Sequence, residues 1–209
     1  LRLIDDTFED NISLSGIQSN SKLIKNGNLF VAIDGNKDNG EDYIDEAVNR
    51  GAVAILTSNK RIKKENIPVI FNQNPRKKLS QLSKLFFPGS PDTICAVTGT
   101  NGKTSTVDFL YQIWELLGYN SATIGTLGVR SKKLNINTVN TTPCPIKLHQ
   151  TLDKLAKLRV SNLALEVSSH AIDQYRINSV NLESACFTNL SLDHMDYHKS
   201  INDYSNTKF

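Results

Sequence analysis

The chain of 209 residues is long enough for one large or two small domains, and its hydrophobic content of 39% is ordinary for a globular protein with a buried core. Its 24 Lys and Arg residues exceed its 21 Asp and Glu residues by a formal charge of +3, which is spread along the chain. Scattered charge of this kind is typical of a solvated surface, so we expect no nucleic-acid partner.

The spacing of the cysteines and the length of the apolar runs restrict the cellular compartment that we expect for the protein. Cys95, Cys144 and Cys186 form no CxxC pair, which argues against a zinc site or a disulfide framework and favours a reducing compartment. No apolar run approaches the roughly 18 residues of a membrane span, and no signal sequence opens the chain. We therefore predict a cytoplasmic protein without a membrane partner. The chain begins with Leu1 rather than Met and ends at Phe209 after a polar segment, so we interpret both ends as truncations.

In the first 90 residues, apolar runs of strand length alternate with helical patterns. Residues 28–33, 52–56 and 68–71 are predicted strands, and the turn-forming stretch 34–40 follows the first of them. Helical spacing of apolar residues from Tyr43 to Val48, and again from Leu79 to Phe86, predicts two helices. The turn-rich segment 87–92 comes next, and we place the domain boundary there, giving domains 1–90 and 91–209.

Strands and helices also alternate after this boundary. The predicted strands are 94–97, 163–167 and 185–188. One helical face carries Val107, Leu110, Trp114 and Leu117 and is closed by Gly118, and a second helix is predicted over 148–158. This alternation predicts an α/β fold with a parallel sheet.

The segment Thr-Gly-Thr-Asn-Gly-Lys-Thr-Ser at 98–105 lies between a predicted buried strand and an amphipathic helix. Glycines allow backbone N–H groups to face phosphate oxygens, Lys103 can reach the terminal phosphates, and the Thr104 hydroxyl can bind Mg²⁺. The general P-loop pattern has glycine where this chain has Val97, so the segment is a narrower variant. We predict that it binds a nucleotide through Gly99, Thr100, Asn101, Gly102, Lys103, Thr104 and Ser105.

Acidic and imidazole side chains follow two of the predicted strands. Glu166 lies at the end of its strand, where open α/β sheets place their ligands, so it could meet the Mg²⁺ of the phosphate segment. Residues 193–198 include Asp193, His194, Asp196 and His198, which suit a second divalent ion, although their spacing matches no zinc pattern. On spacing alone, a capping or surface role for Glu166 and a structural role for the histidines stay open.

Four segments, in order along the chain, resemble the Mur ligases. They are residues 98–104, Asn-Thr-Thr-Pro at 140–143, Glu-Val-Ser-Ser-His at 166–170, and Phe-Thr-Asn-Leu at 187–190 followed by Asp193 and His194. The resemblance covers nearly all of the chain and is closest to the branch that adds the third peptide residue. It implies a small N-terminal α/β domain that binds the UDP substrate over 1–90, and an incomplete parallel-sheet ATPase domain of the P-loop type over 91–209. It also implies a C-terminal ligase domain that is absent here.

The resemblance further implies the roles of particular residues. Lys103, Glu166, His194 and Lys208 would be catalytic, and Thr104, Glu166, His194 and Lys208 would bind Mg²⁺. Lys208 would do so as N6-carboxylysine, formed from CO₂ and a neutral amine. Substrate contacts are implied at Ser19, Ser21, Asn36, Lys37, Asp38, Asn140, Thr141, Thr142, Ser168, Gln174 and Arg176. The family often has Asp-Ser-Arg at positions 20–22, where this chain has Asn-Ser-Lys.

The implied cofactors are ATP and Mg²⁺, and the implied setting is peptidoglycan synthesis by a cytoplasmic monomer. The carboxylate of UDP-N-acetylmuramoyl-L-alanyl-D-glutamate would attack the γ-phosphorus to form an acyl phosphate. The amine of meso-diaminopimelate or L-lysine would then displace phosphate. Positioning and charge neutralisation are what such a reaction requires. Two alternatives are another ATP-dependent amide ligase, such as folylpolyglutamate synthetase, and a fragment that binds nucleotide or UDP-sugar without turnover; we expect the isolated chain to lack ligase activity.

Overall fold

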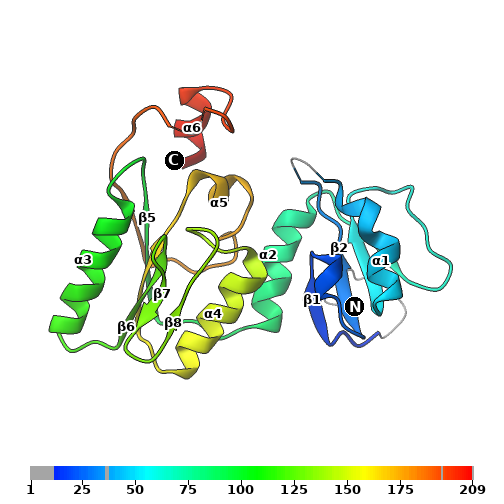
Figure 1. The fold of residues 1–209 in the computed structure, drawn as a ribbon, viewed down its shortest axis with the longest axis horizontal. Coiled ribbons are helices and arrows are strands. Elements are labelled where there is room, and N and C mark those ends of the chain that lie inside the picture. Colours follow the sequence, from blue (N-terminus) through cyan, green and yellow to red (C-terminus); the bar gives the residue numbers. More distant parts are fainter. Residues whose placement is uncertain (1–11, 36–37, 194, 209) are drawn as a thin grey trace. The chain divides into compact units, whose positions relative to one another are not determined.

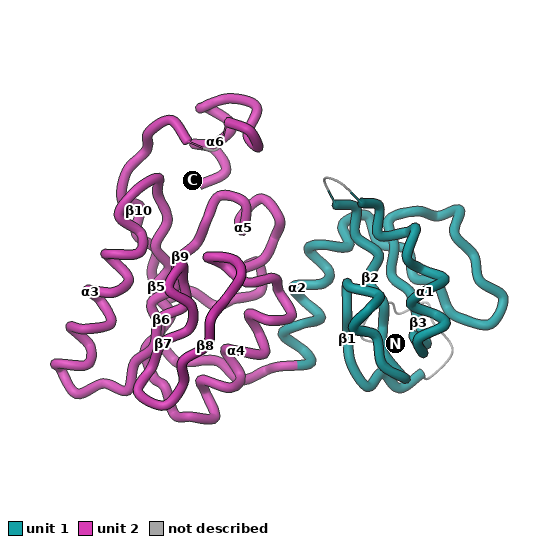
Figure 2. Tube along the Cα trace, in the orientation of Figure 1, with its two compact units in different colours: residues 1–86 teal, residues 87–209 magenta. Residues whose placement is uncertain are grey.

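The computed structural model describes residues 12–35, 38–193 and 195–208. The chain divides into two compact units, residues 1–86 and 87–209, drawn in teal and magenta in Figure 2. The division falls at the start of the turn-rich segment 87–92. Three residues with implied roles, Asn36, Lys37 and His194, lie outside the described residues.

Unit 1 is built on a four-stranded sheet in which all neighbouring strands are parallel. In order across the sheet, the strands are β1 (Gly16–Gln18), β2 (Asn28–Val31), β3 (Ala52–Thr57) and β4 (Val69–Phe71). The 3₁₀ turns η1 (Ser21–Leu23) and η2 (Gly40–Tyr43) and helix α1 (Ile44–Asn49) lie between the strands, and helix α2 (Pro75–Phe86) follows β4. Figure 1 labels both helices.

The core of unit 1 explains which of its elements could be predicted. Phe30 of β2 and Ile55 of β3 pack in one cluster with Ile44 and Ala47 of α1. These side chains belong to the apolar runs that indicated strands and a helix. Strand β1 was not predicted, because it has only three residues and only Ile17 among them is buried, which is too short for a periodic signal.

Unit 2 contains a six-stranded sheet in the order β10-β5-β9-β6-β7-β8. Its strands are β5 (Thr93–Thr98), β6 (Ser121–Gly125), β7 (Gly128–Ser131), β8 (Asn135–Ile136), β9 (Asn162–Glu166) and β10 (Ser184–Phe187). The strands from β10 to β6 are parallel, which confirms the predicted α/β fold with a parallel sheet. Strand β6 and the antiparallel strands β7 and β8 were not predicted; β7 joins β6 through the tight turn at Gly125–Gly128.

Two helices pack against this sheet, α3 (Lys103–Leu116) and α4 (Pro145–Lys157). Successive strand side chains point to opposite faces, so Leu163 and Leu165 of β9 share a cluster with α4, whereas Ala164 packs with α3. Glu166 lies two residues after Ala164 in the same strand, so its side chain points to the same face of the sheet, the face covered by α3. The alternation along one strand therefore directs this carboxylate toward the start of α3.

Two shorter helices complete unit 2, α5 (Ser169–Asp173) after β9 and α6 (Ile201–Lys208) near the end of the described chain. Both lie beyond the carboxyl ends of the parallel strands in Figure 1. Helices α5 and α6 contact each other. Within residues 12–35, 38–193 and 195–208, no helix is both long and apolar enough to cross a membrane.

Candidate functional site

Two glycines shape the loop between β5 and α3. Gly99 has φ of 140° and Gly102 has φ of 81°, a region that side chains with a Cβ rarely adopt. A Cβ at Gly99 would also lie 1.9 Å from Oγ1 of Thr188. Gly102 caps α3 without any side-chain hydrogen bond to the helix end. Because glycine has no side chain, residue 102 provides no side-chain cap for the N–H groups in the first turn of α3. Uncapped N–H groups at a helix start favour an anion.

The segment 188–191, which follows β10, holds this loop in position. The N–H of Thr100 donates to the carbonyl oxygen of Asn189 at 2.9 Å, and the N–H of Asn101 donates to Oδ1 of Asn189 at 2.9 Å. The Thr188 hydroxyl donates to the carbonyl oxygen of Asn101 at 2.7 Å. The Phe-Thr-Asn-Leu segment therefore anchors the loop between β5 and α3, a role that its spacing did not indicate.

Lys103, the first residue of α3, folds back over the same loop. Its Nζ donates to the carbonyl oxygens of Gly99 and Thr100, each at 2.8 Å. Burial lowers the pKa of Lys103, and the nearby charge of Lys208 lowers it further. An anion at the loop would replace these neutral carbonyls as the partner of the ammonium group and would favour its charged form.

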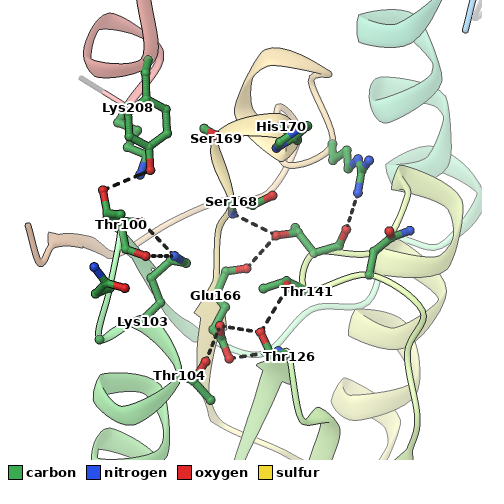
Figure 3. A pocket seen from close by; sticks show the side chains of 17 residues that line it. Thr100, Lys103, Thr104, Thr126, Thr141, Glu166, Ser168, Ser169, His170 and Lys208 are labelled. Carbon is green, nitrogen blue, oxygen red and sulfur yellow. Dashed lines mark hydrogen bonds between the residues drawn. The ribbon is translucent and has the colours of Figure 1, made fainter. Parts of the chain in front are cut away.

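Glu166 is 1% exposed and is the centre of a hydroxyl network at the carboxyl end of β9 (Figure 3). Its Oε2 accepts hydrogen bonds from the hydroxyls of Thr104 at 3.0 Å and Thr126 at 3.1 Å, and its Oε1 accepts the N–H of Thr126 at 3.0 Å. Thr126 Oγ1 also lies 3.0 Å from Thr141 Oγ1. One buried carboxylate thus connects α3 to the loop that carries the Asn-Thr-Thr-Pro segment.

Gly125 leaves the space that this carboxylate occupies. A Cβ at position 125 would lie 2.1 Å from Glu166 Oε1 and 2.5 Å from its carboxyl carbon. We predict that Gly125→Ala displaces the carboxylate and lowers the free energy of unfolding by about 2 kcal/mol through overpacking. Urea denaturation would measure this loss. Gly118→Ala serves as a comparison because nothing lies within 4 Å of the added Cβ, although its φ of 85° adds backbone strain; a smaller loss for Gly125→Ala would contradict the prediction.

A second network involves the residues expected to face the substrate. The Thr142 hydroxyl donates to the backbone carbonyl of Glu166 at 2.9 Å and accepts the N–H of Ser168 at 3.1 Å. Arg176 donates through Nη1 to the Thr142 carbonyl at 2.7 Å, and through Nη2 to Gln174 Oε1 at 2.8 Å. Gln174 therefore orients the guanidinium group of Arg176, which lines the pocket described below.

Helix α6 brings Lys208 to the same region. Lys208 Nζ lies 2.5 Å from the hydroxyl of Tyr204 and 4.0 Å from the centre of its ring. Burial lowers the pKa of Lys208 to about 8. A lysine with this pKa is far more often neutral at neutral pH than an exposed lysine is. Neutrality is the condition for reaction with CO₂.

These elements enclose a pocket of about 480 Å³ in unit 2 (Figure 3). Two described residues with an expected nucleotide or substrate contact in this unit, Ser105 and Gln174, do not line it. The candidate metal ligands Asp193, Asp196 and His198 do not line it either. Thr126, Ser169, His170 and Tyr204 line it but were not predicted as site residues. The complete lining is Gly99, Thr100, Asn101, Gly102, Lys103, Thr104, Thr126, Asn140, Thr141, Thr142, Glu166, Ser168, Ser169, His170, Arg176, Tyr204 and Lys208.

The segment 193–198 was considered as a second metal site. His198 is buried and its Nε2 lies 2.9 Å from Ser169 Oγ, so its ring is engaged with α5 rather than exposed in the pocket. In the part of the chain that the structure describes, no three His, Cys, Asp or Glu side chains converge as a metal site. His194 is outside that part, and its expected role stays a prediction.

Unit 1 has its own polar pocket, of about 340 Å³. Ser19, Ser21 and Asp38, which were expected to contact uridine, line it. The Ser21 hydroxyl donates to Oε2 of Glu46 at 2.6 Å, and this hydrogen bond is the main cause that lowers the pKa of Glu46. All the described residues that were expected to contact uridine therefore line this one pocket.

Unit 2 is an α/β domain in which a loop with two glycines connects the buried strand β5 to helix α3, an arrangement that suits a phosphate group. Residues 97–209 match the Mur ligase middle domain, and residues 13–87 match the catalytic domain of the Mur ligase family. The chain therefore belongs to the Mur ligase family.

Individual relatives agree with this assignment. The chain is 45% identical over 193 residues to a UDP-N-acetylmuramoyl-L-alanyl-D-glutamate–2,6-diaminopimelate ligase of Bradyrhizobium diazoefficiens, covering 92% of this chain and 40% of the relative. It is 40% identical to the ligase of the same name from Mesorhizobium japonicum, covering 98% of this chain and 43% of the relative. The chain thus spans less than half the length of these relatives.

Solved structures show the same fold. A structure of a UDP-N-acetylmuramoyl-L-alanyl-D-glutamate–2,6-diaminopimelate ligase superposes with a TM-score of 0.82 at 26% identity, covering 99% of this chain and 43% of that one. The MurF ligase of Thermotoga maritima in complex with ADP superposes with a TM-score of 0.61 at 21% identity, covering 95% and 43%.

Proposed function

We propose that this chain contributes the ATP site and the UDP-substrate contacts of an ATP-dependent amide ligase in peptidoglycan synthesis. The substrate would be UDP-N-acetylmuramoyl-L-alanyl-D-glutamate, and the added amino acid 2,6-diaminopimelate, which the names of relatives at 40–45% identity specify. The observation that carries the proposal is a single pocket lined by the phosphate loop, Glu166 and the substrate-facing residues, including Arg176.

The pocket suits a nucleotide triphosphate with Mg²⁺. The hydroxyl of Thr104 and the carboxylate of Glu166 are oxygen donors 3.0 Å apart, and Mg²⁺ prefers oxygen ligands. We propose that these two groups hold one ion, which when bound neutralises phosphate charge. Lys103 would neutralise charge on the terminal phosphates, and the glycine loop would place backbone N–H groups against phosphate oxygens.

Arg176 and the threonines would position the dipeptide. Its carboxylate would attack the γ-phosphorus of ATP to give an acyl phosphate and ADP, and the amine of the amino acid would then form the amide and release phosphate. No side chain has to act as a nucleophile in this sequence. A carbamate at Lys208 would supply an anion for a second ion, together with His194, and the low pKa of Lys208 supports that modification.

The deciding experiment is to titrate the chain with UDP-muramoyl dipeptide, with and without ATP, by calorimetry. We predict that Arg176→Lys weakens dipeptide binding about tenfold while ATP affinity is retained, because lysine cannot donate to Thr142 and Gln174 in the same fork geometry. Arg61→Lys, an exposed arginine in unit 1, should change neither affinity. The proposal fails if the unchanged chain binds neither ligand.

A further inference from the structure

Hydrogen bonds connect Tyr197, in the segment between β10 and α6, to the end of α5. The Tyr197 hydroxyl donates to Oδ2 of Asp173 at 2.5 Å and accepts from Nε2 of Gln174 at 3.2 Å. Asp173 is the last residue of α5, and Gln174 follows it directly. The amide of Gln174 also meets Arg176, which lines the pocket. One phenol is therefore linked to the pocket through one amide.

The direction of each hydrogen bond follows from the chemistry of the groups. A carboxylate accepts and does not donate, so the single proton of the Tyr197 hydroxyl goes to Asp173. The phenol oxygen can then only accept from Gln174, which turns the NH₂ end of the amide toward Tyr197. The carbonyl oxygen Oε1 is at the other end, toward Arg176. Asp173 and Tyr197 therefore favour the orientation of the amide that a guanidinium group requires.

The oxygen Oε1 of Gln174 holds one edge of the Arg176 guanidinium group. It accepts from Nη2 at 2.8 Å and from Nε at 3.2 Å, so one oxygen fixes two neighbouring N–H groups. Nη1 donates to the backbone carbonyl of Thr142 at 2.7 Å. The Thr142 carbonyl belongs to the main chain, whereas Oε1 of Gln174 ends a side chain that loses rotational freedom when it is held. This second acceptor needs an anchor, and the Tyr197 hydroxyl supplies one.

We propose that Tyr197 is a positioning residue for the substrate, which holds Gln174 so that Arg176 is oriented before the substrate binds. The inference rests on the proposed function, in which Arg176 positions the UDP-muramoyl dipeptide. A carboxylate of the dipeptide would meet a guanidinium group whose plane is already set, so less conformational freedom is lost on binding. Lys103 and Thr104, which are expected to hold the nucleotide, have other partners, so ATP binding should not depend on Tyr197.

The aromatic ring of Tyr197 has a packing role that can be separated from that of its hydroxyl. The ring centre lies 4.0 Å from the centre of the His170 ring and 5.0 Å from that of His198. A purely structural role for Tyr197 would depend on this packing, whereas the proposed role depends on the hydroxyl. Tyr197→Phe distinguishes the two, because phenylalanine keeps the ring and removes only the hydroxyl.

The test is calorimetric titration of the 209-residue chain with UDP-muramoyl dipeptide and, separately, with ATP and Mg²⁺. We expect Tyr197→Phe to weaken dipeptide binding about fivefold, the effect of one lost neutral hydrogen bond, and to leave ATP affinity unchanged. Arg176→Lys alone and Arg176→Lys combined with Tyr197→Phe should bind the dipeptide equally, because Tyr197 acts through Arg176. Tyr119→Phe, at a half-exposed position outside the pocket, should change neither affinity.

Equal dipeptide affinity of Tyr197→Phe and the unchanged chain would overturn the inference. Independent effects in the double variant, about fiftyfold in total rather than about tenfold, would also overturn it, as would an equal loss of ATP affinity, since both indicate a general loosening of the domain. Gln174→Met provides a second measurement if Tyr197→Phe does not fold. It removes the amide at similar length and should weaken dipeptide binding at least as much, so an unchanged affinity would count against the inference.

The unchanged chain separates failure of the inference from failure of the proposed function. If it does not bind the dipeptide, both the inference and the substrate part of the proposed function are wrong. ATP binding by that same chain would show that the nucleotide part still stands. If the unchanged chain binds the dipeptide and Arg176→Lys weakens this binding while Tyr197→Phe does not, the inference alone is wrong.

Discussion

Replacing Lys103 by alanine is expected to weaken ATP binding on the order of 100-fold, because a charge-assisted contact with the terminal phosphates is lost. The ammonium group already lies over the loop, 2.8 Å from two of its carbonyl oxygens, so little rearrangement is needed to meet a phosphate. Calorimetric titration with ATP and Mg²⁺ measures the effect.

Lys133→Ala is the matched control for this experiment. Lys133 is an exposed lysine of unit 2 that does not line the pocket, so its loss removes the same formal charge without removing a phosphate contact. Equal weakening by both substitutions would show that net charge, rather than the position of Lys103, determines binding. Dipeptide binding measured without ATP should survive Lys103→Ala, which would separate the two ligand sites.

Replacing Glu166 by glutamine is expected to weaken ATP binding in the presence of Mg²⁺ on the order of 100-fold, because most of the strengthening by Mg²⁺ is lost. Glutamine has nearly the same shape but no negative charge, so an ion at Thr104 would lose its anionic ligand. The fold should persist. The new amide can still accept the N–H of Thr126 through its oxygen, and its NH₂ group can donate to the hydroxyls of Thr104 and Thr126.

The measurement is ATP affinity over a series of Mg²⁺ concentrations, with thermal unfolding as a check on folding. Glu183→Gln, at an exposed position outside the pocket, should keep the full response to Mg²⁺. If Mg²⁺ strengthens ATP binding as much in Glu166→Gln as in the unchanged chain, the carboxylate binds no ion. It would then serve only to order its three hydrogen-bond donors, the hydroxyls of Thr104 and Thr126 and the N–H of Thr126.

Local patterns predicted the parts of the site that lie together in the chain. The loop between β5 and α3 could be predicted because a strand, two glycines, Lys103 and a helix follow one another directly in the sequence. The conformational preference of each of these depends on only a few neighbouring residues. Glu166 could be predicted because parallel strands place their carboxyl ends at one edge of a sheet. Its direction toward α3 follows from alternation along β9, which the sequence also contains.

Other parts of the site depend on contacts that no local pattern records. Thr126 follows the short β6 and shares Glu166 with Thr104, yet a single threonine in a turn gives no signal. The hydroxyl of Tyr204 meets a loop that lies far before it in the chain. The role of Thr188 and Asn189 in anchoring that loop likewise appears only when β10 pairs with β5.

The sequence by itself determined the α/β class, the glycine-containing loop between a strand and a helix and, through resemblance, the family to which the chain belongs. These follow from periodicity and from short motifs, because strand, helix and glycine preferences act over a few residues. Only the tertiary structure decided that Gly125 makes room for Glu166, that Gln174 orients Arg176, and that Tyr204 connects Lys208 to Thr100. Each of these depends on distances between atoms from separate elements, which are set by how the strands and helices pack.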